Sequence, residues 1–302
     1  MNPWKYINVG QFLFRVLLIS MTNSPLKNNG DISSLAKIYK QIFDASFYPF
    51  SIIYNEMNLS SQSLPSEYQK MLDDLDDQVL QLDRKVFKRL KKLGYNPQII
   101  YDVGASNSGW SYYIKKILTE AEFYLFEPLI DYSSDYQGLM SEILRVFPSF
   151  HLFKYALGEK SGTVTMNIFE NAVSSTALTI SDIGQKTIPV EIPMLSMDEA
   201  IATFNLPNPQ VIKIDTQGSE LSILKGAIET LPKVDVLFLE CWLYRGYGNE
   251  TPLLTEIADW LLPLNFRLWD ITEPYRDPDD ILATLDCIFI NTKSAIAPDW
   301  YY

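Results

Sequence analysis

The chain has 302 residues, of which 47% are hydrophobic, so it is long enough for one large domain with an attached segment. Its formal net charge of −12 disfavours nucleic acids and anionic membrane surfaces as partners, because both are bound by clusters of Lys and Arg. The two cysteines, Cys241 and Cys287, form no CxxC or Cys/His grouping, which disfavours a disulfide framework and a structural zinc site. We expect both thiols to be buried and free.

The N-terminal part of the chain shows two short helical patterns. Residues 12–19 are apolar except for Arg15, and this run is too short to cross a bilayer and lacks a clear cleavage site for a signal peptide. It therefore predicts a buried or interfacial helix. Residues 31–43 carry apolar side chains at helical spacing and predict a second helix. Without a secretory signal or a spanning segment, we expect the protein in the cytoplasm.

The clearest helical pattern begins at Ser66 and ends before Gly94. Ser66 and Gln69 match a capping box, whereas Gly94 followed by Pro97 marks a helix end. Acidic residues fill the first half and basic residues the second, as the helix dipole favours. We predict one amphipathic helix whose apolar stripe covers the sheet domain, the active site or a second subunit. Its stripe consists of Leu72, Leu75, Val79, Leu82, Val86, Leu90 and Leu93.

From Gln98 onward the pattern alternates between strands and helices, which is typical of an α/β domain. The connection between the last two strands is too short for a parallel crossover, so the last strand is predicted to be antiparallel. Two further runs, 162–169 and 186–194, predict a hairpin-like insertion. The seven strands are expected at 98–103, 123–127, 151–156, 211–215, 236–241, 266–270 and 286–291.

These patterns divide the chain into two parts. Residues 1–94 are predicted to form a helical attachment, which could also join two copies of the chain into a homodimer. Residues 95–302 are predicted to form a Rossmann-like domain with a mostly parallel sheet.

The segment from Val211 to Ala227 predicts a buried strand, a turn at Gln217 and Gly218, and an amphipathic helix. Ligands of an open parallel sheet bind beyond the carboxyl ends of its strands, so Asp215 is expected at the lip of a site. Further short motifs accompany this segment: Tyr101–Ala105 (YDVGA), Leu125–Pro128 (LFEP), Ala156–Gly158 (ALG), Ser174–Thr176 (SST) and Leu239–Tyr244 (LECWLY).

Together these motifs resemble those of the FkbM-type methyltransferases, which transfer methyl groups from S-adenosylmethionine (SAM). The resemblance covers about residues 98–292 and implies a class I methyltransferase sheet with SAM as cofactor. It also implies O-methylation of a hydroxyl group on a sugar or secondary metabolite, and hence a small-molecule or glycan acceptor. The alternatives are a carboxyl or amine acceptor, and a non-catalytic binding or scaffold protein. A nucleic-acid methyltransferase is disfavoured, because Asp215 is followed by Thr-Gln-Gly instead of Pro-Pro-aromatic.

Three strand ends are predicted to bind SAM. Gly104 allows a close approach of the backbone, and the helix start that follows suits the carboxylate of the cofactor. The resemblance implies a second glycine four residues later, where this chain has Ser108 and the glycine is displaced to Gly109. Glu127 is predicted to accept hydrogen bonds from both ribose hydroxyls, and an NAD site is disfavoured because the full GxGxxG fingerprint is missing. The predicted cofactor contacts are Asp102, Gly104, Ser106, Asn107, Glu127, Pro128, Ala156 and Leu157, of which the last two face the adenine.

Asp215 and Glu240 are the predicted catalytic residues. They end neighbouring strands, so their carboxylates are expected to face the acceptor as a base and a hydrogen-bond partner. As an alternative, the two carboxylates hold a divalent cation such as Mg²⁺. In the structural alternative, Asp215 caps the turn and Glu240 pairs with Lys213 or Arg245.

Gln217, Trp242 and Tyr244 are predicted to contact the acceptor, because they follow these two strand ends. His151 is the only histidine, and it starts a strand at the end of the sheet away from the expected site. It is therefore not expected to be the general base.

Overall fold

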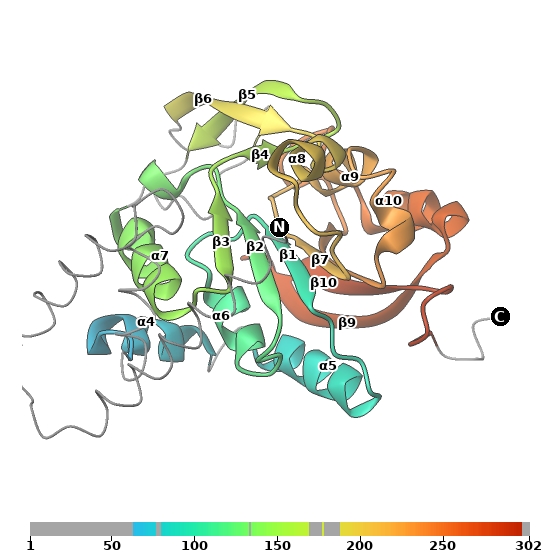
Figure 1. Cartoon of the computed structure of the whole chain (residues 1–302). Coiled ribbons are helices and arrows are strands. Elements are labelled where there is room, and N and C mark those ends of the chain that lie inside the picture. Colours follow the sequence, from blue (N-terminus) through green and yellow to red (C-terminus); the bar gives the residue numbers. More distant parts are fainter. Residues whose placement is uncertain (1–62, 77–79, 133, 169–176, 178–187, 298–302) are drawn as a thin grey trace, which may run out of the picture. The chain divides into compact units, whose positions relative to one another are not determined.

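The computed structural model of the chain describes residues 63–76, 80–132, 134–168, 177 and 188–297 (Figure 1). By its internal contacts the chain divides into residues 1–62 and a unit from Ser63 to Tyr302, and only the second is considered below. The helices predicted for 12–19 and 31–43, and the motif at 174–176, lie outside the described residues. Within the described ranges, no helix combines the length and apolar character needed to span a membrane.

A seven-stranded sheet with the order β3-β2-β1-β7-β8-β10-β9 forms the centre of this unit. The strands from β3 to β8 in this order are parallel, whereas β10 is antiparallel to both β8 and β9, as predicted. The strand order reverses between β1 and β7, which opens a crevice at the carboxyl ends of these two strands. The strands are β1 (Ile99–Val103), β2 (Glu122–Phe126), β3 (Phe150–Phe153), β7 (Val211–Ile214), β8 (Val236–Trp242), β9 (Phe266–Arg276) and β10 (Leu282–Asn291).

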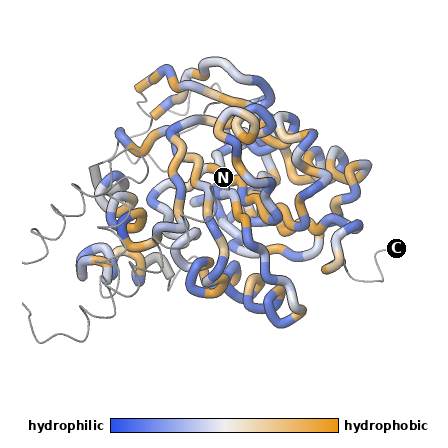
Figure 2. The backbone as a smooth tube through the Cα atoms, viewed as in Figure 1, coloured by the Kyte–Doolittle hydropathy of each residue, from blue (hydrophilic) through white to orange (hydrophobic). Residues whose placement is uncertain are grey.

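Helices cover both faces of the sheet, and apolar residues gather along its strands (Figure 2). One face carries the core that includes Phe87, Trp110 and Phe238, and the other carries the core that includes Leu224, Leu237 and Ile257. Cys241 and Cys287 are buried in the second core as free thiols, which confirms the prediction. The first face is covered by α4 (Ser66–Asp76), α5 (Gln81–Lys92), α6 (Gly109–Lys115) and α7 (Ser134–Val146), and the second by α8 (Met197–Phe204), α9 (Glu220–Lys225) and α10 (Leu254–Leu261).

A second, three-stranded sheet has the order β4-β6-β5. The strands β5 (Gly162–Ile168) and β6 (Ile188–Leu195) are antiparallel, as expected for the predicted insertion. The predicted third strand was too long, because β3 already ends at Phe153. The next residues form β4 (Ala156–Leu157), which pairs with β6 instead of continuing the large sheet. Short 3-10 helices at Ile130–Tyr132, Leu231–Lys233 and Leu262–Leu264 complete the connections.

The prediction of one continuous helix between Ser66 and Gly94 is wrong. The structure has two helices, and Leu80 stands before α5 with a non-helical backbone (φ −99°, ψ 7°). Val79 lies outside the described residues. The end at Gly94 is confirmed: this glycine has a φ of +88°, and the amide of Tyr95 donates to the Leu90 carbonyl at 3.0 Å, as in a Schellman motif.

The buried face of α5 is also rotated relative to the predicted stripe. Leu82 and Leu93 are 38% and 64% exposed, whereas Phe87 is fully buried. The Phe87 ring packs against those of Trp110 and Phe238, with centroids 5.6 and 6.0 Å away. The face of α5 that carries Phe87 packs on aromatic rings of α6 and β8, which leaves Leu82 and Leu93 exposed. By these contacts α5 packs on the large sheet, while the division of the chain at residue 94 stays a prediction.

Asp83 is a fully buried carboxylate on this apolar face of α5. It accepts hydrogen bonds from Trp110 Nε1 at 3.1 Å and from Thr272 Oγ1 at 2.6 Å, and so joins α5 to α6 and β9. Burial raises the pKa of Asp83 from 3.8 to about 7, although the bond from Thr272 opposes the rise. The first turn of α5 is thus tied to the sheet by a polar group that the apolar pattern did not reveal.

We predict that Asp83→Asn stabilises the protein above about pH 7. Because the pKa is higher in the folded than in the unfolded chain, the folded protein binds more protons between about pH 4 and 7, and its free energy of unfolding falls as the pH rises through this window. The neutral amide removes that loss, so the variant should gain about 1–3 kcal/mol at about pH 8. Urea unfolding across this pH range measures the effect, with exposed Asp259→Asn as control. An unchanged pH dependence in Asp83→Asn would contradict the assignment.

Candidate active site

A cavity of about 680 Å³ lies at the carboxyl ends of β1, β2 and β7, where the strand order reverses. Its volume is within the usual range for small-molecule sites. The structure brings together at its wall six of the eight predicted cofactor residues, one predicted catalytic residue and one predicted acceptor contact. These are Gly104, Ser106, Glu127, Pro128, Ala156, Leu157, Asp215 and Gln217.

Gly104 sits where β1 meets the end of β7. Its φ of +78° favours glycine, and a Cβ atom there would lie 1.9 Å from the carbonyl oxygen of Asp215. The amide of Gly104 donates to the Phe126 carbonyl at 2.9 Å, and the amide of Asp215 donates to the Val103 carbonyl at 3.0 Å. The turn after β1 is therefore held tightly between the ends of β2 and β7.

Glu127 follows β2 and is only 8% exposed, yet its carboxylate lies on the cavity wall. Its Oε2 accepts from the Ser106 amide at 2.8 Å, and its Oε1 accepts from the Leu129 amide at 2.7 Å. Burial raises the pKa of Glu127, while these two backbone donors act against the rise. Each carboxylate oxygen can accept more than one bond, so Glu127 keeps capacity for hydroxyl groups of a ligand.

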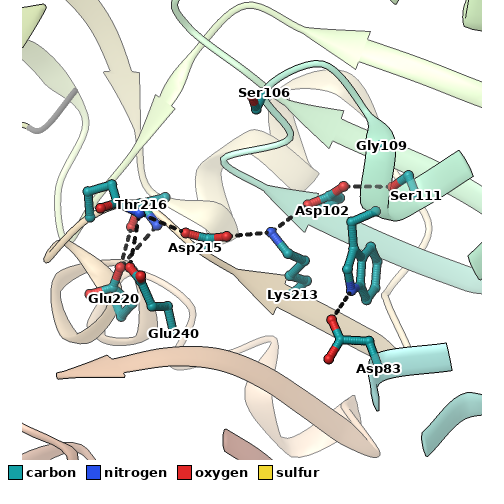
Figure 3. Close-up of polar contacts among 12 residues, drawn as sticks. Asp83, Asp102, Ser106, Gly109, Ser111, Lys213, Asp215, Thr216, Glu220 and Glu240 are labelled. Carbon is teal, nitrogen blue, oxygen red and sulfur yellow. Dashed lines mark hydrogen bonds and ion pairs between the residues drawn. The ribbon is translucent and has the colours of Figure 1, made fainter. Parts of the chain in front are cut away.

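Asp102 and Lys213 form a buried ion pair (Figure 3), and neither residue lines the cavity. Asp102 also accepts from Ser111 Oγ at 2.6 Å, and Lys213 Nζ lies 3.5 Å from Asp102 and 3.2 Å from Asp215. Burial lowers the pKa of Lys213, but the carboxylates of Asp215, Asp102 and Asp286 together raise it above its usual value. The lysine therefore stays cationic and supports Asp215 from below.

Asn107 is the other predicted cofactor residue that is not on the cavity wall. Its Oδ1 accepts from the amide of Gly109 at 3.0 Å, at the first residue of α6. This side chain closes the turn before the helix.

Asp215 and Glu240 are joined by one side-chain amide. Gln217 Nε2 donates to Asp215 Oδ1 and to Glu240 Oε2, both at 3.1 Å. Asp215 lines the cavity, and its side chain is 36% exposed. Glu240 does not line the cavity. Burial, and then the carboxylates of Asp215 and Glu220, raise the pKa of Glu240 well above its usual range, which favours its neutral form.

Glu220 fixes the turn that carries Gln217. Its Oε1 accepts from the amide and hydroxyl of Thr216, at 3.0 and 3.1 Å, and from the Gly218 amide at 3.1 Å (Figure 3). Gln217 and Gly218 have left-handed backbones, with φ values of +57° and +104°. Burial raises the pKa of Glu220 to about 7. The capping role expected from its place in the first turn of α9 explains these bonds.

Trp242 and Tyr244, the other predicted acceptor contacts, do not line the cavity. The Trp242 ring packs edge-on against Tyr244, with centroids 6.2 Å apart, and Tyr244 donates to Asp277 Oδ2 at 3.0 Å. Their contact with an acceptor stays a prediction. His151 lies 3.5 Å from Glu122 at the start of β2, far along the strands from the cavity.

Tyr247 is a residue of the site that the sequence did not predict. Its hydroxyl donates to Gln217 Oε1 at 2.7 Å, although thirty residues separate the two in the chain. It lies in the loop after β8, three residues beyond the LECWLY motif, where no periodic pattern marks a side chain. In the part of the chain that the structure describes, no three His, Cys, Asp or Glu side chains are arranged to hold a metal ion.

The family model described as the methyltransferase FkbM domain matches residues 102–268, which is more than half of the chain. The chain belongs to the FkbM methyltransferase family. It is therefore a SAM-dependent methyltransferase, as the motifs predicted.

Three individual proteins that resemble this chain share 28% or less of its sequence. Hexuronic acid methyltransferase AglP of Haloferax volcanii is 28% identical over 201 residues, which cover 67% of this chain and 76% of that protein. The crystal structure of methyltransferase FkbM from Methylobacillus flagellatus has a TM-score of 0.41 at 18% identity, over 64% of this chain and 43% of that one. A SAM-dependent methyltransferase from Aquifex aeolicus has a TM-score of 0.37 at 14% identity, over 76% and 100%.

Ser108 stands where the resemblance to the FkbM family implies a glycine, and its backbone keeps the conformation that a glycine favours. Its φ is +65°, and its buried Oγ lies 2.9 Å from Met140 Sδ. The left-handed conformation costs a non-glycine residue about 1–2 kcal/mol. The loop thus has the shape of a glycine loop in spite of the substitution.

We expect Ser108→Gly to leave the affinity for S-adenosylhomocysteine within about twofold, because the backbone already has a shape that glycine adopts. The free energy of unfolding should change by less than about 1 kcal/mol, since relief of strain offsets the lost buried contact. Ser108→Val should be clearly destabilising, because a β-branched residue resists this conformation. Calorimetric titration and thermal unfolding measure both. A folded Ser108→Gly protein without ligand binding would show that the loop depends on the serine.

Proposed function

We propose that this methyltransferase transfers the methyl group of SAM to a hydroxyl oxygen of a sugar-type acceptor, with Asp215 as the base. The observation that carries this proposal is the position of Asp215. It lies on the wall of the same cavity as Gly104 and Glu127, is partly exposed, and is held by Lys213 and Gln217. The name of the relative AglP, a hexuronic acid methyltransferase, supports an acceptor of the sugar-acid class.

The proposed cofactor contacts follow the cavity wall. Glu127 would receive the ribose hydroxyls, since this residue lines the cavity and each of its carboxylate oxygens can accept a further hydrogen bond. Ala156 and Leu157, both buried and apolar, would pack against the adenine. Gly104 and Ser106 would leave room for the methionine half. Asp102 would act from beneath, by holding Lys213.

SAM supplies a methyl group that is already activated on a sulfonium. The residues of the chain have to orient the acceptor and remove its proton. As the acceptor oxygen bonds to the methyl carbon, the C–S bond breaks, its electron pair stays on sulfur, and the hydroxyl proton passes to Asp215. Lys213 and Gln217 each occupy one oxygen of Asp215, and each oxygen keeps a lone pair for that proton.

The site favours a hydroxyl over a carboxylate acceptor. A carboxylate is already ionised and needs no base, and it would have to approach the carboxylate of Asp215 on the cavity wall. The cation nearest to Asp215, Lys213, is already paired with two carboxylates. A hydroxyl group, in contrast, both needs the base and suits a negatively charged wall.

The test is methyl transfer from labelled SAM to methyl glucoside, methyl glucuronide and methyl galacturonide, followed by mass spectrometry. We expect a methyl ether, which survives mild alkali. If mild alkali releases methanol from the product, the product is a methyl ester. The acceptor would then be the carboxyl group, not a hydroxyl group. No transfer to any of the three sugars by a protein that binds SAM would overturn the sugar-type acceptor.

We expect Glu127→Ala to weaken SAM binding by about 1.5–3 kcal/mol, or roughly tenfold to more than one hundredfold, because the charged acceptor of two hydroxyl groups is lost. Glu127 also holds the amides of Ser106 and Leu129, so part of the loss would come from the loop itself. Isothermal titration with SAM and S-adenosylhomocysteine measures it, with exposed Glu229→Ala as control. Unchanged affinity in Glu127→Ala would place the ribose elsewhere.

A further inference from the structure

The loop between β8 and α10, residues 243–253, is built around Arg245. The guanidinium of Arg245 donates to the Thr251 carbonyl at 2.5 Å and forms an ion pair with Glu256 at the start of α10. Thr251 is fully buried, and its Oγ1 accepts from the amide of Tyr247 at 3.0 Å. These contacts tie the backbone at Tyr247 to the body of the domain.

The Tyr247 side chain is directed from this loop to the site. Its ring packs edge-on against Trp242, with centroids 5.1 Å apart and planes at 65°, and its hydroxyl donates to Gln217 Oε1 at 2.7 Å. Trp242 is in turn covered by Gly246, where a Cβ atom would come within 2.1 Å of the ring. Ring and hydroxyl are thus fixed by separate contacts.

The bond from Tyr247 to Oε1 is one of the contacts that fix how the Gln217 amide is turned. The amide nitrogen of the same side chain, Nε2, donates to Asp215 and to Glu240, both at 3.1 Å. A flipped amide would direct its oxygen at the carboxylate of Asp215 and lose the hydrogen bond to it. Burial raises the pKa of Tyr247, so the phenol stays protonated and remains a donor to Oε1. Without this hydroxyl the amide loses one of the bonds that orient it, and its bond to Asp215 is less well positioned.

We propose that Tyr247 is a positioning residue of the methyl-transfer reaction, which acts through Gln217 to orient the carboxylate of Asp215. This inference rests on the proposed role of Asp215 as the base. It assigns to the loop after β8 a part in turnover that does not require contact with SAM.

The test begins with Tyr247→Phe, which keeps the ring and removes the hydroxyl. We expect kcat with the sugar acceptor to fall about tenfold while the Kd for SAM stays within about twofold, as for the loss of one hydrogen bond in the reacting complex. The control is Tyr95→Phe, which loses a hydroxyl bonded to Asp235 and the Gln210 carbonyl at the other end of the sheet.

A double-mutant cycle separates positioning from general damage. In a Gln217→Ala background, Tyr247→Phe should have no further effect on kcat, because the residue through which it acts is gone. Equal losses in both backgrounds, or a lowered thermal midpoint with unchanged kcat per folded molecule, would overturn the inference. If the wild type methylates none of the three sugars, the proposed acceptor fails. Crystal structures of wild type and Tyr247→Phe then decide the inference: Gln217 still bridging Asp215 and Glu240 in the variant would refute it.

Discussion

Replacing Asp215 by Asn is expected to lower kcat by a factor of about 10²–10⁴, the usual range for loss of a general base. The amide has the size of the carboxylate and can still bond to Gln217 through its oxygen. The Kd for SAM should therefore stay within about threefold, because the proposed cofactor contacts lie at Glu127 and Ala156. Labelled methyl transfer and isothermal titration measure the two quantities, with Asp131→Asn, a surface partner of Lys154, as control.

Two outcomes would contradict this role of Asp215. A variant with a lower thermal midpoint but normal turnover per folded molecule would make Asp215 a structural cap of the turn. Activity of the wild type that is lost with EDTA and restored by Mg²⁺ would make it a metal ligand. The neighbouring Lys213 makes the first outcome measurable, because this buried lysine would keep Asp102 but lose one of its two carboxylate partners, which lowers stability.

Gly104→Ala is expected to have the second large effect. The added Cβ would lie 1.9 Å from the Asp215 carbonyl oxygen, which is backbone and cannot rotate away. Either β1 or the end of β7 has to move, so we expect a loss of about 3 kcal/mol or more in the free energy of unfolding. SAM affinity should fall at least about one hundredfold, because the ends of β2 and β7, which carry Glu127 and Asp215, would shift relative to each other.

Gly94→Ala is the matched control for this substitution. Gly94 also has a left-handed backbone, with φ at +88°, but no atom lies within 4 Å of the position of its Cβ. The substitution Gly94→Ala should therefore lower the free energy of unfolding only by the cost of a left-handed alanine, about 1–2 kcal/mol. It should leave the affinity for SAM unchanged. Equal losses in the two variants would show that the close approach of Gly104 to Asp215 has no consequence.

The sheet could be predicted from the sequence because its strands are apolar runs bounded by polar turns. The short connection before β10 was sufficient to predict that the last strand is antiparallel. The end of β3 was predicted too late, since nothing local to residues 154–156 shows that Ala156 pairs with Met194 of β6. Pairing over such a distance depends on the whole fold.

The helices before the sheet show the limit of periodicity. Leu82 and Leu93 fit a helical stripe but are exposed, whereas Asp83 is buried because Trp110 and Thr272 bind it. A carboxylate on an apolar face has no signature in hydropathy, since its partners come from distant elements.

The candidate site was predictable where residues directly follow parallel strands. Gly104, Glu127 and Asp215 come to one cavity for that reason. Asp102 does not line the cavity, because it lies inside β1, where side chains alternate between the two faces, and its carboxylate pairs with Lys213. Tyr247 was missed, because its reach to Gln217 depends on the fold of a loop.

The most direct test of the proposed cofactor site and of Asp215 as the base is a crystal structure of the protein with S-adenosylhomocysteine bound. We expect the ribose hydroxyls at Glu127, the adenine against Ala156 and Leu157, and the sulfur facing Asp215 across the space left for the acceptor. A ligand bound outside this cavity, or one whose sulfur is turned away from Asp215, would contradict the proposed site and its base.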